Sequence, residues 1–346
     1  MVSHGSADPA LEQESRFWGT VTRLLLDSGA IPYDVDRRRA TKIRDREVLL
    51  KLGSRRADPE IEERWRGVFA DRTLALLKRM GARRVLELGC GAGWLALEMA
   101  RHGLEVHAVD FSEERIEIAR EYYRERSRHE KLAPVRYEVR NIELFEPSHG
   151  TYDAIVSFTT LHHISGKQRV IEQCYQALPE GGRLIVFDDE HESGPWVWRG
   201  FRGLTVLALA LPLLPLPSPV PRRRRLLEAA EPLARGLFSP RTRDRLRSLI
   251  SPILWRREGS GAIARGSPFE GVHDDHHASL DDLFASVFDE VQVERGELFG
   301  LRNLLVLDVP RPLRAILTRL LYALDHPSSA RLPGIATYLV ATKRAS

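Results

Sequence analysis

The sequence predicts an α/β fold, namely a Rossmann-like, doubly wound and mostly parallel sheet. Three observations predict it. Segments typical of strands alternate with helical segments between residues 84 and 187, a cluster of glycines follows the first of these strands, and a strand-like pattern returns near the C-terminus. Strands that alternate with helices form parallel sheets through right-handed crossovers.

The composition is typical of a folded protein, and the distribution of charge bears on which partners it can bind. The chain has 346 residues, of which 43% are hydrophobic and 29% charged, which is enough for a packed core and a polar surface. This length predicts about two domains, or one domain with large additions. Lys and Arg total 52 against 48 for Asp and Glu, and both signs are spread along the chain, which argues against a nucleic-acid partner. The two cysteines favour a reducing, cytoplasmic location.

Two helices are expected before the alternating region. The first covers residues 11–28 and stops at Gly29, a plausible C-cap. The second covers residues 58–80, with Pro59 in its first turn, where a missing N–H costs nothing. Between the two helices, the arginines at 37–39 are interpreted as a solvated turn and not as a phosphate site, with contact to an anionic group of the substrate as the alternative.

The alternating region supplies five strands and three helices. The strands are expected at residues 84–88, 105–109, 134–140, 152–157 and 182–187. The helices are expected at residues 94–101, 112–129 and 167–178. The alternation stops after residue 188 and resumes with a helix at 279–286 and strands at 288–294 and 337–342.

These elements divide the chain into four regions. Residues 1–80 form a helical N-terminal extension, and residues 81–189 form the cofactor-binding core. Residues 190–278 are an apolar, proline-rich and arginine-rich insertion that interrupts the core. Residues 279–346 complete the sheet.

The glycine loop after the first strand is the strongest feature of the sequence. Gly89, Gly91 and Gly93 let the backbone turn tightly and approach a ligand, and a helix begins directly behind them. Free N–H groups at such a helix start can bind a polar or charged group. Asp110 ends the second strand, where a carboxylate can accept both ribose hydroxyls of an adenosine cofactor. The alternative is a tight turn without a ligand.

The spacing of the glycines argues against a dinucleotide. A dinucleotide-binding loop needs its third glycine at position 94, where this chain has Trp94, a side chain that would obstruct a pyrophosphate. Glu87, ahead of the loop, favours a cationic ligand over a pyrophosphate for electrostatic reasons.

At these residues the sequence resembles the class I S-adenosylmethionine-dependent methyltransferases. Residues 87–93 are similar to the first motif of that family, and residues 109–112 are similar to its second. The resemblance implies that Asp110 holds the ribose and that Phe111 covers the adenine. It places Asn141 beside the adenine amino group, where many members have Asp, and an amide oxygen can accept the same hydrogen bond.

The resemblance covers roughly residues 81–190, with a weaker match in 279–345. Residues 152–157 and 179–186 match its fourth-strand and fifth-strand motifs. It implies a sheet of about seven strands with the last one antiparallel, a helical N-terminal extension and a large lid insertion after strand 5. It also implies S-adenosylmethionine as cofactor and S-adenosylhomocysteine as product. The cofactor-binding residues that it implies are Glu87, Gly89, Cys90, Gly91, Gly93, Asp110, Phe111, Asn141, Ile142 and Ser157.

Methyl transfer to an alcohol or a phenol also needs a base. His162 and His163 follow the fourth strand, at the edge where open α/β sheets bind ligands, and Glu190 and His191 follow the fifth strand at the same edge. These four residues are the candidates for the catalytic base. The alternatives are that one histidine packs under the cofactor while the other caps the next helix, and that residues 188–192 form a solvated loop.

Neither a metal site nor a nucleic-acid substrate is expected. The segment His273–His277 is rich in His and Asp, but its adjacent histidines diverge, and it precedes a helix start, where acids are favoured. A histidine of this segment that faces the substrate is the alternative. After the fourth strand the chain has residues Ser157–Thr160, whereas enzymes that methylate nucleobase amines carry an Asn/Asp-Pro-Pro-aromatic sequence there.

The insertion holds an apolar run followed by Arg222–Arg225. In the family that the sequence resembles, additions at this place commonly form the substrate lid, and an aromatic and leucine-rich lining suits a hydrophobic acceptor. Residues 203–225 would alternatively make peripheral contact with an anionic membrane or pack as a plain helical subdomain. Prolines interrupt this run, which argues against a membrane span. The sequence does not specify an oligomeric state.

Together these features predict a cytoplasmic S-adenosylmethionine-dependent methyltransferase. Its expected acceptor is a hydrophobic small molecule, such as a specialised metabolite or a lipid-like compound, which takes the methyl group by in-line displacement. Oxygen is the preferred nucleophile, and carbon and nitrogen stay open. The alternatives are an enzyme that binds the same cofactor but catalyses a non-methylating reaction such as a cyclisation, and a membrane-associated lipid methyltransferase.

Overall fold

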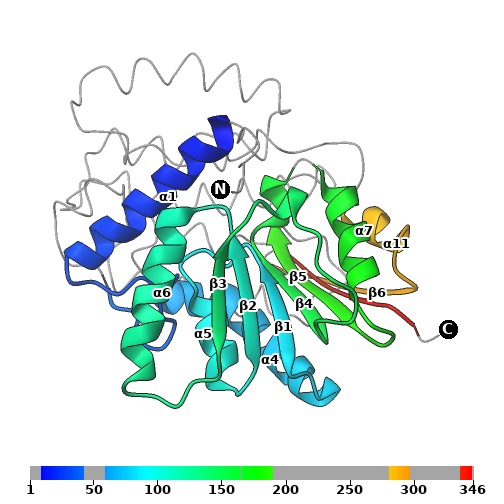
Figure 1. Ribbon diagram of the computed structural model, residues 1–346, viewed down its shortest axis with the longest axis horizontal. Helices are drawn as coiled ribbons and strands as arrows, with labels where there is room; N and C mark the ends of the chain where they lie inside the picture. Colours follow the sequence, from blue (N-terminus) through cyan, green and yellow to red (C-terminus); the bar gives the residue numbers. More distant parts are fainter. Residues whose placement is uncertain (1–8, 43–58, 165, 190–279, 297–335, 345–346) are drawn as a thin grey trace, which may run out of the picture.

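The computed structural model describes residues 9–42, 59–164, 166–189, 280–296 and 336–344 (Figure 1). The strands are β1 (Arg84–Leu88), β2 (Glu105–Asp110), β3 (Val135–Val139), β4 (Ala154–Phe158), β5 (Arg183–Asp189), β6 (Glu290–Gly296) and β7 (Ala336–Thr342). They form one sheet in the order β3-β2-β1-β4-β5-β7-β6. Strands β1 to β5 pair in parallel, and β7 runs antiparallel to both β5 and β6. The predicted fold class, including the antiparallel last strand, is confirmed.

The helices follow the predicted rhythm. The α-helices are α1 (Pro9–Asp27), α3 (Pro59–Glu62), α4 (Val68–Met80), α5 (Trp94–Arg101), α6 (Glu113–Ser127), α7 (Lys167–Ala177) and α11 (Leu280–Ala285). Short turns of other helix types are η1 (Glu63–Gly67), η2 (Ile142–Leu144) and η3 (Leu161–His163). The prediction of one regular helix over 58–80 is wrong in part, because the π-helical turn η1 separates α3 from α4. Strand β5 is also longer than predicted, since it continues through Asp188 to Asp189.

The sheet carries a hydrophobic layer on each face because successive side chains of a strand point to opposite sides. On β1, Val85 belongs to the layer that packs under α4, α5 and α6, whereas Leu86 and Leu88 belong to the layer under α7 and α11. All of these side chains are buried. Burial on both faces explains why β4 and β5 contain continuous apolar runs instead of an alternating pattern.

Stacked aromatic rings fill the first layer beside α4. The ring of Phe187, which is fully buried, lies 4.7 Å from Phe69 and 5.3 Å from Phe158, measured between ring centroids. Phe69 also stacks on Tyr338 of β7 at 5.3 Å. The cluster therefore joins α4 to β4, β5 and β7, which lie far apart in the sequence.

The N-terminal extension is fastened to the core by buried charges. Residues 28–42, called the N-terminal strap below, follow α1 and pack against α4 and α5 (Figure 1). The carboxylate of Asp36 is fully buried and receives two hydrogen bonds of 2.9 Å from the Arg101 guanidinium. Burial alone would raise the pKa of Asp36, and the bonds from Arg101 hold that pKa below its usual range.

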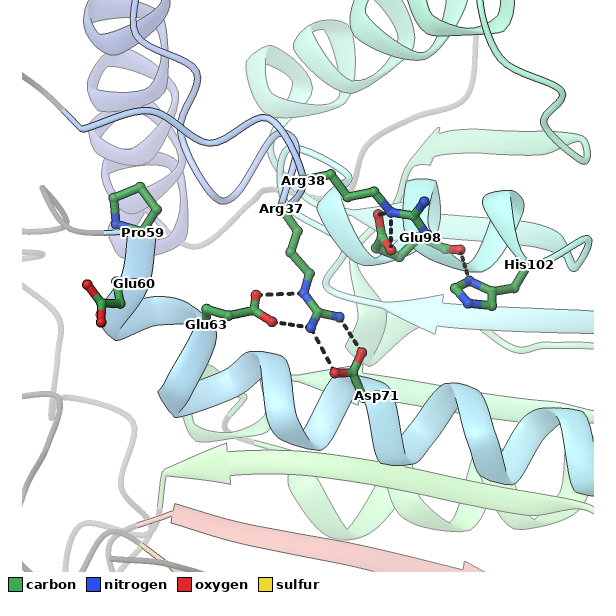
Figure 2. A pocket seen from close by; sticks show the side chains of 8 residues that line it. All are labelled: Arg37, Arg38, Pro59, Glu60, Glu63, Asp71, Glu98 and His102. Carbon is green, nitrogen blue, oxygen red and sulfur yellow. Dashed lines mark hydrogen bonds and ion pairs between the residues drawn. The ribbon is translucent and has the colours of Figure 1, made fainter. Parts of the chain in front are cut away.

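Residues 37–39 form the predicted turn, in which Arg38 and Arg39 are exposed, but the interpretation as a solvated turn is wrong for Arg37, whose side chain is largely covered. Arg37 donates to the carboxylates of Glu63 and Asp71, and Arg38 donates to Glu98 at 3.0 Å. These groups line a polar pocket of about 510 Å³, in which the dashed lines of Figure 2 join each arginine to its acid. The guanidinium groups therefore neutralise the local carboxylates and hold the strap against α4 and α5.

Several sequence predictions lie outside the described residues. These are the insertion at 190–278 with its apolar run at 203–225, the segment His273–His277, and the candidate bases Glu190 and His191. Within the part of the chain that the structure describes, no helix combines the length and the hydropathy that a membrane crossing requires.

The aromatic cluster gives the first testable prediction. Replacing Phe187 with Ala removes a fully buried ring from between two others, and we expect the free energy of unfolding to fall by about 3–5 kcal/mol. Leu144 is the matched control, because its side chain is 63% exposed and its replacement with Ala should change the stability by less than about 0.5 kcal/mol. Chemical denaturation measures both values. A loss below about 1 kcal/mol for Phe187→Ala would contradict the described core.

Candidate cofactor site and catalytic edge

The glycine loop joins β1 to α5 at the carboxyl edge of the sheet. Gly89, Gly91 and Gly93 have φ values of 73°, 55° and 90°, in the left-handed region that residues with a side chain rarely adopt. The backbone N–H of Gly91 donates to Asp110 at the end of β2, over 2.8 Å. Because β1 and β2 are adjacent and parallel, their carboxyl ends bring the loop and the acid together.

Neighbouring side chains fill the space that a Cβ atom would need at each glycine. A Cβ on Gly89 would lie 2.1 Å from Oγ1 of Thr160, and a Cβ on Gly91 would lie 2.1 Å from a terminal nitrogen of Arg115. At Gly93 the obstructing groups are Ala119 and Tyr137, at 2.9 Å each. The loop is thus a tightly enclosed backbone surface, and the three positions exclude side chains both by conformation and by contact.

Glu87 places a buried acid beneath the loop. Its side chain is 2% exposed, and its Oε2 atom has no hydrogen-bond partner among the described residues. Burial raises the pKa of this carboxyl to about 8, the neighbouring Asp110 adds to the rise, and the backbone N–H of Ala96 opposes it. A cationic group that bound here would return the carboxyl to its charged form. This supports the prediction that the loop takes a cationic ligand.

Asp110 lies beside the glycine loop and holds it in place through hydrogen bonds. One carboxylate oxygen accepts from Gly91, and the other accepts from the backbone N–H of Ser112 at 2.9 Å. The side chain is 4% exposed. Each carboxylate oxygen can accept a second hydrogen bond, so capacity for ribose hydroxyls is left. The sequence predicted the ribose contact and did not predict that the same acid braces the loop.

The other residues predicted to bind the cofactor lie along the same edge of the sheet, and they differ in burial and in hydrogen-bond partners. Phe111 is partly exposed directly after Asp110, and Asn141 accepts a hydrogen bond from the backbone N–H of Glu143 at 3.0 Å. Ile142 is buried among the side chains of the second layer. Ser157 at the end of β4 is fully buried, and its hydroxyl has no partner within the described residues.

One feature of the loop agrees with the sequence analysis, and one differs from it. Burial and the charge of Asp110 raise the pKa of the Cys90 thiol well above its usual value, which agrees with the expectation that it is no nucleophile. Trp94 is 5% exposed and packs against Tyr33 of the N-terminal strap, with ring centroids 5.2 Å apart. The Trp94 side chain is therefore packed in the core, although the sequence indicated that it would obstruct a pyrophosphate.

A histidine and an aspartate meet where β4 and β5 end. Nδ1 of His162 lies 2.5 Å from Oδ1 of Asp188, and the backbone N–H of His162 donates to Oδ2 of the same residue at 3.2 Å. Asp188 is fully buried. The carboxylate accepts from Nδ1–H, which orients the ring and leaves the lone pair on the other ring nitrogen. The ring of His163 lies 3.9 Å from that of His162, measured between centroids.

Strained backbone precedes this pair. Thr159 has a φ of 51°, the only positive value at a residue other than glycine in the described ranges. A β-branched residue is disfavoured there, so the conformation must be held by its surroundings. The backbone N–H of Thr159 donates to Phe187 at 2.6 Å, and the hydroxyl of Thr160 donates to the carbonyl oxygen of Gly89 at 3.3 Å. The loop after β4 is thereby fixed to β5 and to the glycine loop.

Two of the alternatives for these residues are wrong in part. Neither histidine caps α7, since its N-cap is Gly166 and no side chain makes a capping hydrogen bond there. Asp188 is not part of a solvated loop, because it lies within β5 and is fully buried. Sequence reasoning missed Thr160 and Arg115 as neighbours of the glycines, and no local pattern in the sequence indicates those contacts.

The described residues fit the cofactor that the sequence implied. S-adenosylmethionine carries a ribose, a sulfonium and an amino-acid ammonium, and the loop offers a bracing carboxylate at Asp110 and a buried, unpaired carboxylate oxygen at Glu87. The hydroxyl of Ser157 is a further unpaired polar group at the same strand edge. Burying polar groups without hydrogen-bond partners destabilises the fold, so their presence favours a ligand that supplies the missing hydrogen bonds.

Glu87 gives the second prediction. Its raised pKa means that the folded protein binds a proton more tightly than the unfolded chain, so its contribution to stability is lost as the pH rises from about 4.5 to about 8. Glu87→Gln should remove this loss, making the ligand-free protein more stable than the wild type above pH 8, while weakening cofactor binding. Thermal unfolding and calorimetric titration measure the two effects.

Glu98→Gln is the control for that prediction. Glu98 is equally buried, but it bonds to Arg101 at 2.6 Å and to Arg38 at 3.0 Å. Its replacement should destabilise the protein at every pH and leave the cofactor affinity of the remaining folded molecules close to that of the wild type. A lower stability of Glu87→Gln at high pH would contradict the assignment of Glu87 as an unpaired acid.

The comparisons with known proteins cover the same part of the chain. A family model described as a methyltransferase domain matches residues 85–182, which hold the glycine loop, Asp110 and β4. The chain is 35% identical over 120 residues to the ubiquinone biosynthesis O-methyltransferase of Xanthomonas oryzae, covering 34% of this chain and 48% of that protein. It is 30% identical over 103 residues to the enzyme of the same name from Coxiella burnetii, covering 30% of this chain and 42% of that one. The chain thus spans about half the length of these relatives, or less.

Solved structures show weaker similarity. Phosphoethanolamine N-methyltransferase 2 of Haemonchus contortus, in complex with S-adenosylhomocysteine, is 15% identical, with a TM-score of 0.43 over 83% of this chain and 60% of that one. The magnesium protoporphyrin IX methyltransferase of Synechocystis, with bound S-adenosylmethionine, is 16% identical, with a TM-score of 0.36 over 53% and 79%. The family match and the glycine loop that it covers give the conclusion: residues 85–182 of this chain match the model of a methyltransferase domain.

Proposed function

We propose that the protein transfers a methyl group from S-adenosylmethionine to an oxygen atom of a hydrophobic small molecule. The observation that carries the proposal is the pair formed by His162 and Asp188. It lies at the carboxyl edge of β4 and β5, next to the glycine loop on β1. A cofactor loop beside an oriented imidazole is what methylation of a hydroxyl group requires.

The glycine loop and its acids would hold the cofactor. When bound, S-adenosylmethionine supplies an electrophilic methyl group on its sulfonium. Asp110 would accept the ribose hydroxyls while it braces Gly91. Glu87 would pair with the cationic end of the ligand, which lowers the cost of its own buried charge. Phe111, Asn141, Ile142 and Ser157 remain proposed contacts of the same ligand.

His162 would remove the proton from the acceptor hydroxyl. With Nδ1–H donated to Asp188, the lone pair of the other ring nitrogen can take that proton as the oxygen attacks. Buried Asp188 then stabilises the imidazolium that forms, because it provides a negative charge in contact with the ring. The remaining task is to align the acceptor with the methyl group and to exclude water.

His163, Glu190 and His191 stay in the proposal as further candidates for the base. The ring of His163 lies beside that of His162, tilted by 42°, so it can also set the orientation of that ring. Glu190 and His191 directly follow β5 in the sequence and lie outside the described residues. The variants below separate His162 from these three, since only His162 bonds to Asp188 in the described geometry.

The class of acceptor is inferred from the relatives and from the insertion. The relatives that match residues of the core are named as ubiquinone biosynthesis O-methyltransferases, which favours oxygen as the methylated atom and an apolar acceptor. Residues 190–278 are proposed as the lid over that acceptor, with the apolar run at 203–225 as its lining or as a peripheral membrane contact. The remaining regions are proposed as a cover (1–80), the cofactor core (81–189) and a completing segment (279–346).

Cofactor binding is the third prediction and the first experiment. Calorimetric titration of the wild type with S-adenosylmethionine and S-adenosylhomocysteine should give micromolar dissociation constants for at least one of them. Asp110→Ala and Gly91→Val should abolish binding, the first by removing the brace and the ribose contact, the second by placing a side chain against Arg115. Thermal unfolding of each variant checks that it is folded. Absence of binding by the wild type would overturn the proposal.

Catalysis is the fourth prediction. We expect His162→Gln to lower kcat by about 100-fold to 10,000-fold with tail-bearing phenols or catechols, and to leave the affinity for S-adenosylmethionine within about threefold. Asp188→Asn should lower kcat less, and the acid limb of the pH–rate profile should disappear in His162→Gln. The appearance of S-adenosylhomocysteine with a methylated product measures the rate. Turnover that leaves the cofactor unconsumed would instead indicate a non-methylating reaction.

A further inference from the structure

The guanidinium group of Arg115 lies on the glycine loop and has no partner there. Arg115 is in the first turn of α6, and its guanidinium group occupies the space that a Cβ atom on Gly91 would need, with a terminal nitrogen 2.1 Å from that position. Its Nε atom is buried without a hydrogen bond. In the described part of the chain no carboxylate forms an ion pair with this side chain, although Asp110 and Glu87 belong to the same site.

Arg115 differs from most of the buried arginines that the structure describes. Arg101 bonds to Asp36, Glu98 and Glu130, and Arg66 pairs with Asp34. The Nε atom of Arg183 is also buried without a hydrogen bond, but Arg183 is the first residue of β5, at the end of the strand far from the glycine loop. Burying part of a guanidinium without a partner costs free energy, and the fold gains no ion pair from it in return. The position of Arg115 is therefore explained better by a ligand than by folding.

The neighbours of Arg115 indicate which half of the cofactor it faces. Gly91, which the guanidinium covers, donates its N–H to Asp110, the proposed partner of the ribose. The charged amino-acid half of the ligand is assigned to Glu87. Adenosine is uncharged and aromatic, and a planar guanidinium binds such a ring by stacking on its face. An ion pair with the ligand is not required.

We propose that Arg115 binds the adenosine half of the cofactor, with its guanidinium plane against the purine. The inference rests on the proposed cofactor site and adds a residue that determines affinity for the nucleoside alone. Arg115 would then contribute equally to every ligand that carries adenosine, whatever the charge at the other end of that ligand.

Three ligands and three variants separate this role from others. The ligands are S-adenosylmethionine, S-adenosylhomocysteine and 5′-methylthioadenosine, which lacks the amino-acid group. Arg115→Met should weaken all three by the same factor, between about threefold and thirtyfold. Arg115→Lys keeps the charge and loses the plane, so it should restore little of that affinity. Arg124→Met, an exposed arginine on the same helix, should leave all three dissociation constants within twofold.

Glu87→Gln should change the affinities for the three ligands in a different pattern from Arg115→Met. It should weaken the two ligands that carry an ammonium group and leave 5′-methylthioadenosine within twofold. The stability of the ligand-free protein is a second readout, because Arg115→Met removes an unpaired polar group and should unfold at the same temperature as the wild type or higher. A residue that served only the fold would lower that temperature.

Two results would overturn the inference. One is that Arg115→Met changes none of the three dissociation constants by more than twofold. The other is that it weakens only the two ligands with an amino-acid group, which would place Arg115 at that end. If the wild type binds none of the three ligands, the proposed function itself fails. Calorimetric titration of the full chain distinguishes these cases.

Discussion

The hydrogen bond from the Gly91 N–H to Asp110 is the contact on which the candidate site depends. It joins the loop after β1 to the end of β2, and the second oxygen of the same carboxylate holds the start of α6 through Ser112. One acid therefore fixes two βα connections at once. Arg115 on α6 and Glu87 on β1 take their positions relative to this junction. Adjacent parallel strands make the arrangement possible, because they deliver their carboxyl ends to one edge.

The charges of the protein fall into two groups with different energetics. The N-terminal strap is held by paired charges, in which Asp36 meets Arg101 and Arg38 meets Glu98. At the glycine loop, by contrast, the carboxylate oxygen of Glu87 and the guanidinium of Arg115 are buried in part and unpaired. A protein tolerates such groups where a ligand later satisfies them, and pairs them where they only support the fold.

The loop after β4 is strained at one residue and is held in place by hydrogen bonds. Thr159 adopts a left-handed conformation that its side chain disfavours, and hydrogen bonds to β5 and to the glycine loop hold this turn in place. The turn delivers His162 to Asp188 at the end of β5. Two neighbouring strands thus supply the imidazole and the carboxylate, while a third supplies the glycine loop. The site is built on rigid strand ends, which hold reacting groups more accurately than free loops.

The sequence by itself determined the order and type of the elements, the glycine loop and the position of Asp110 at the end of β2. These features rest on local signals, namely the periods of apolar residues, the glycine spacing and the cap residues, which act over a few positions. Tertiary structure alone decided that His162 pairs with Asp188, that Arg115 covers Gly91, and that the arginines at 37 and 38 are bound by acids on α4 and α5. Each of these contacts joins residues far apart in the chain. Local propensity carries no information about such partners, because the packing of strands and helices selects them.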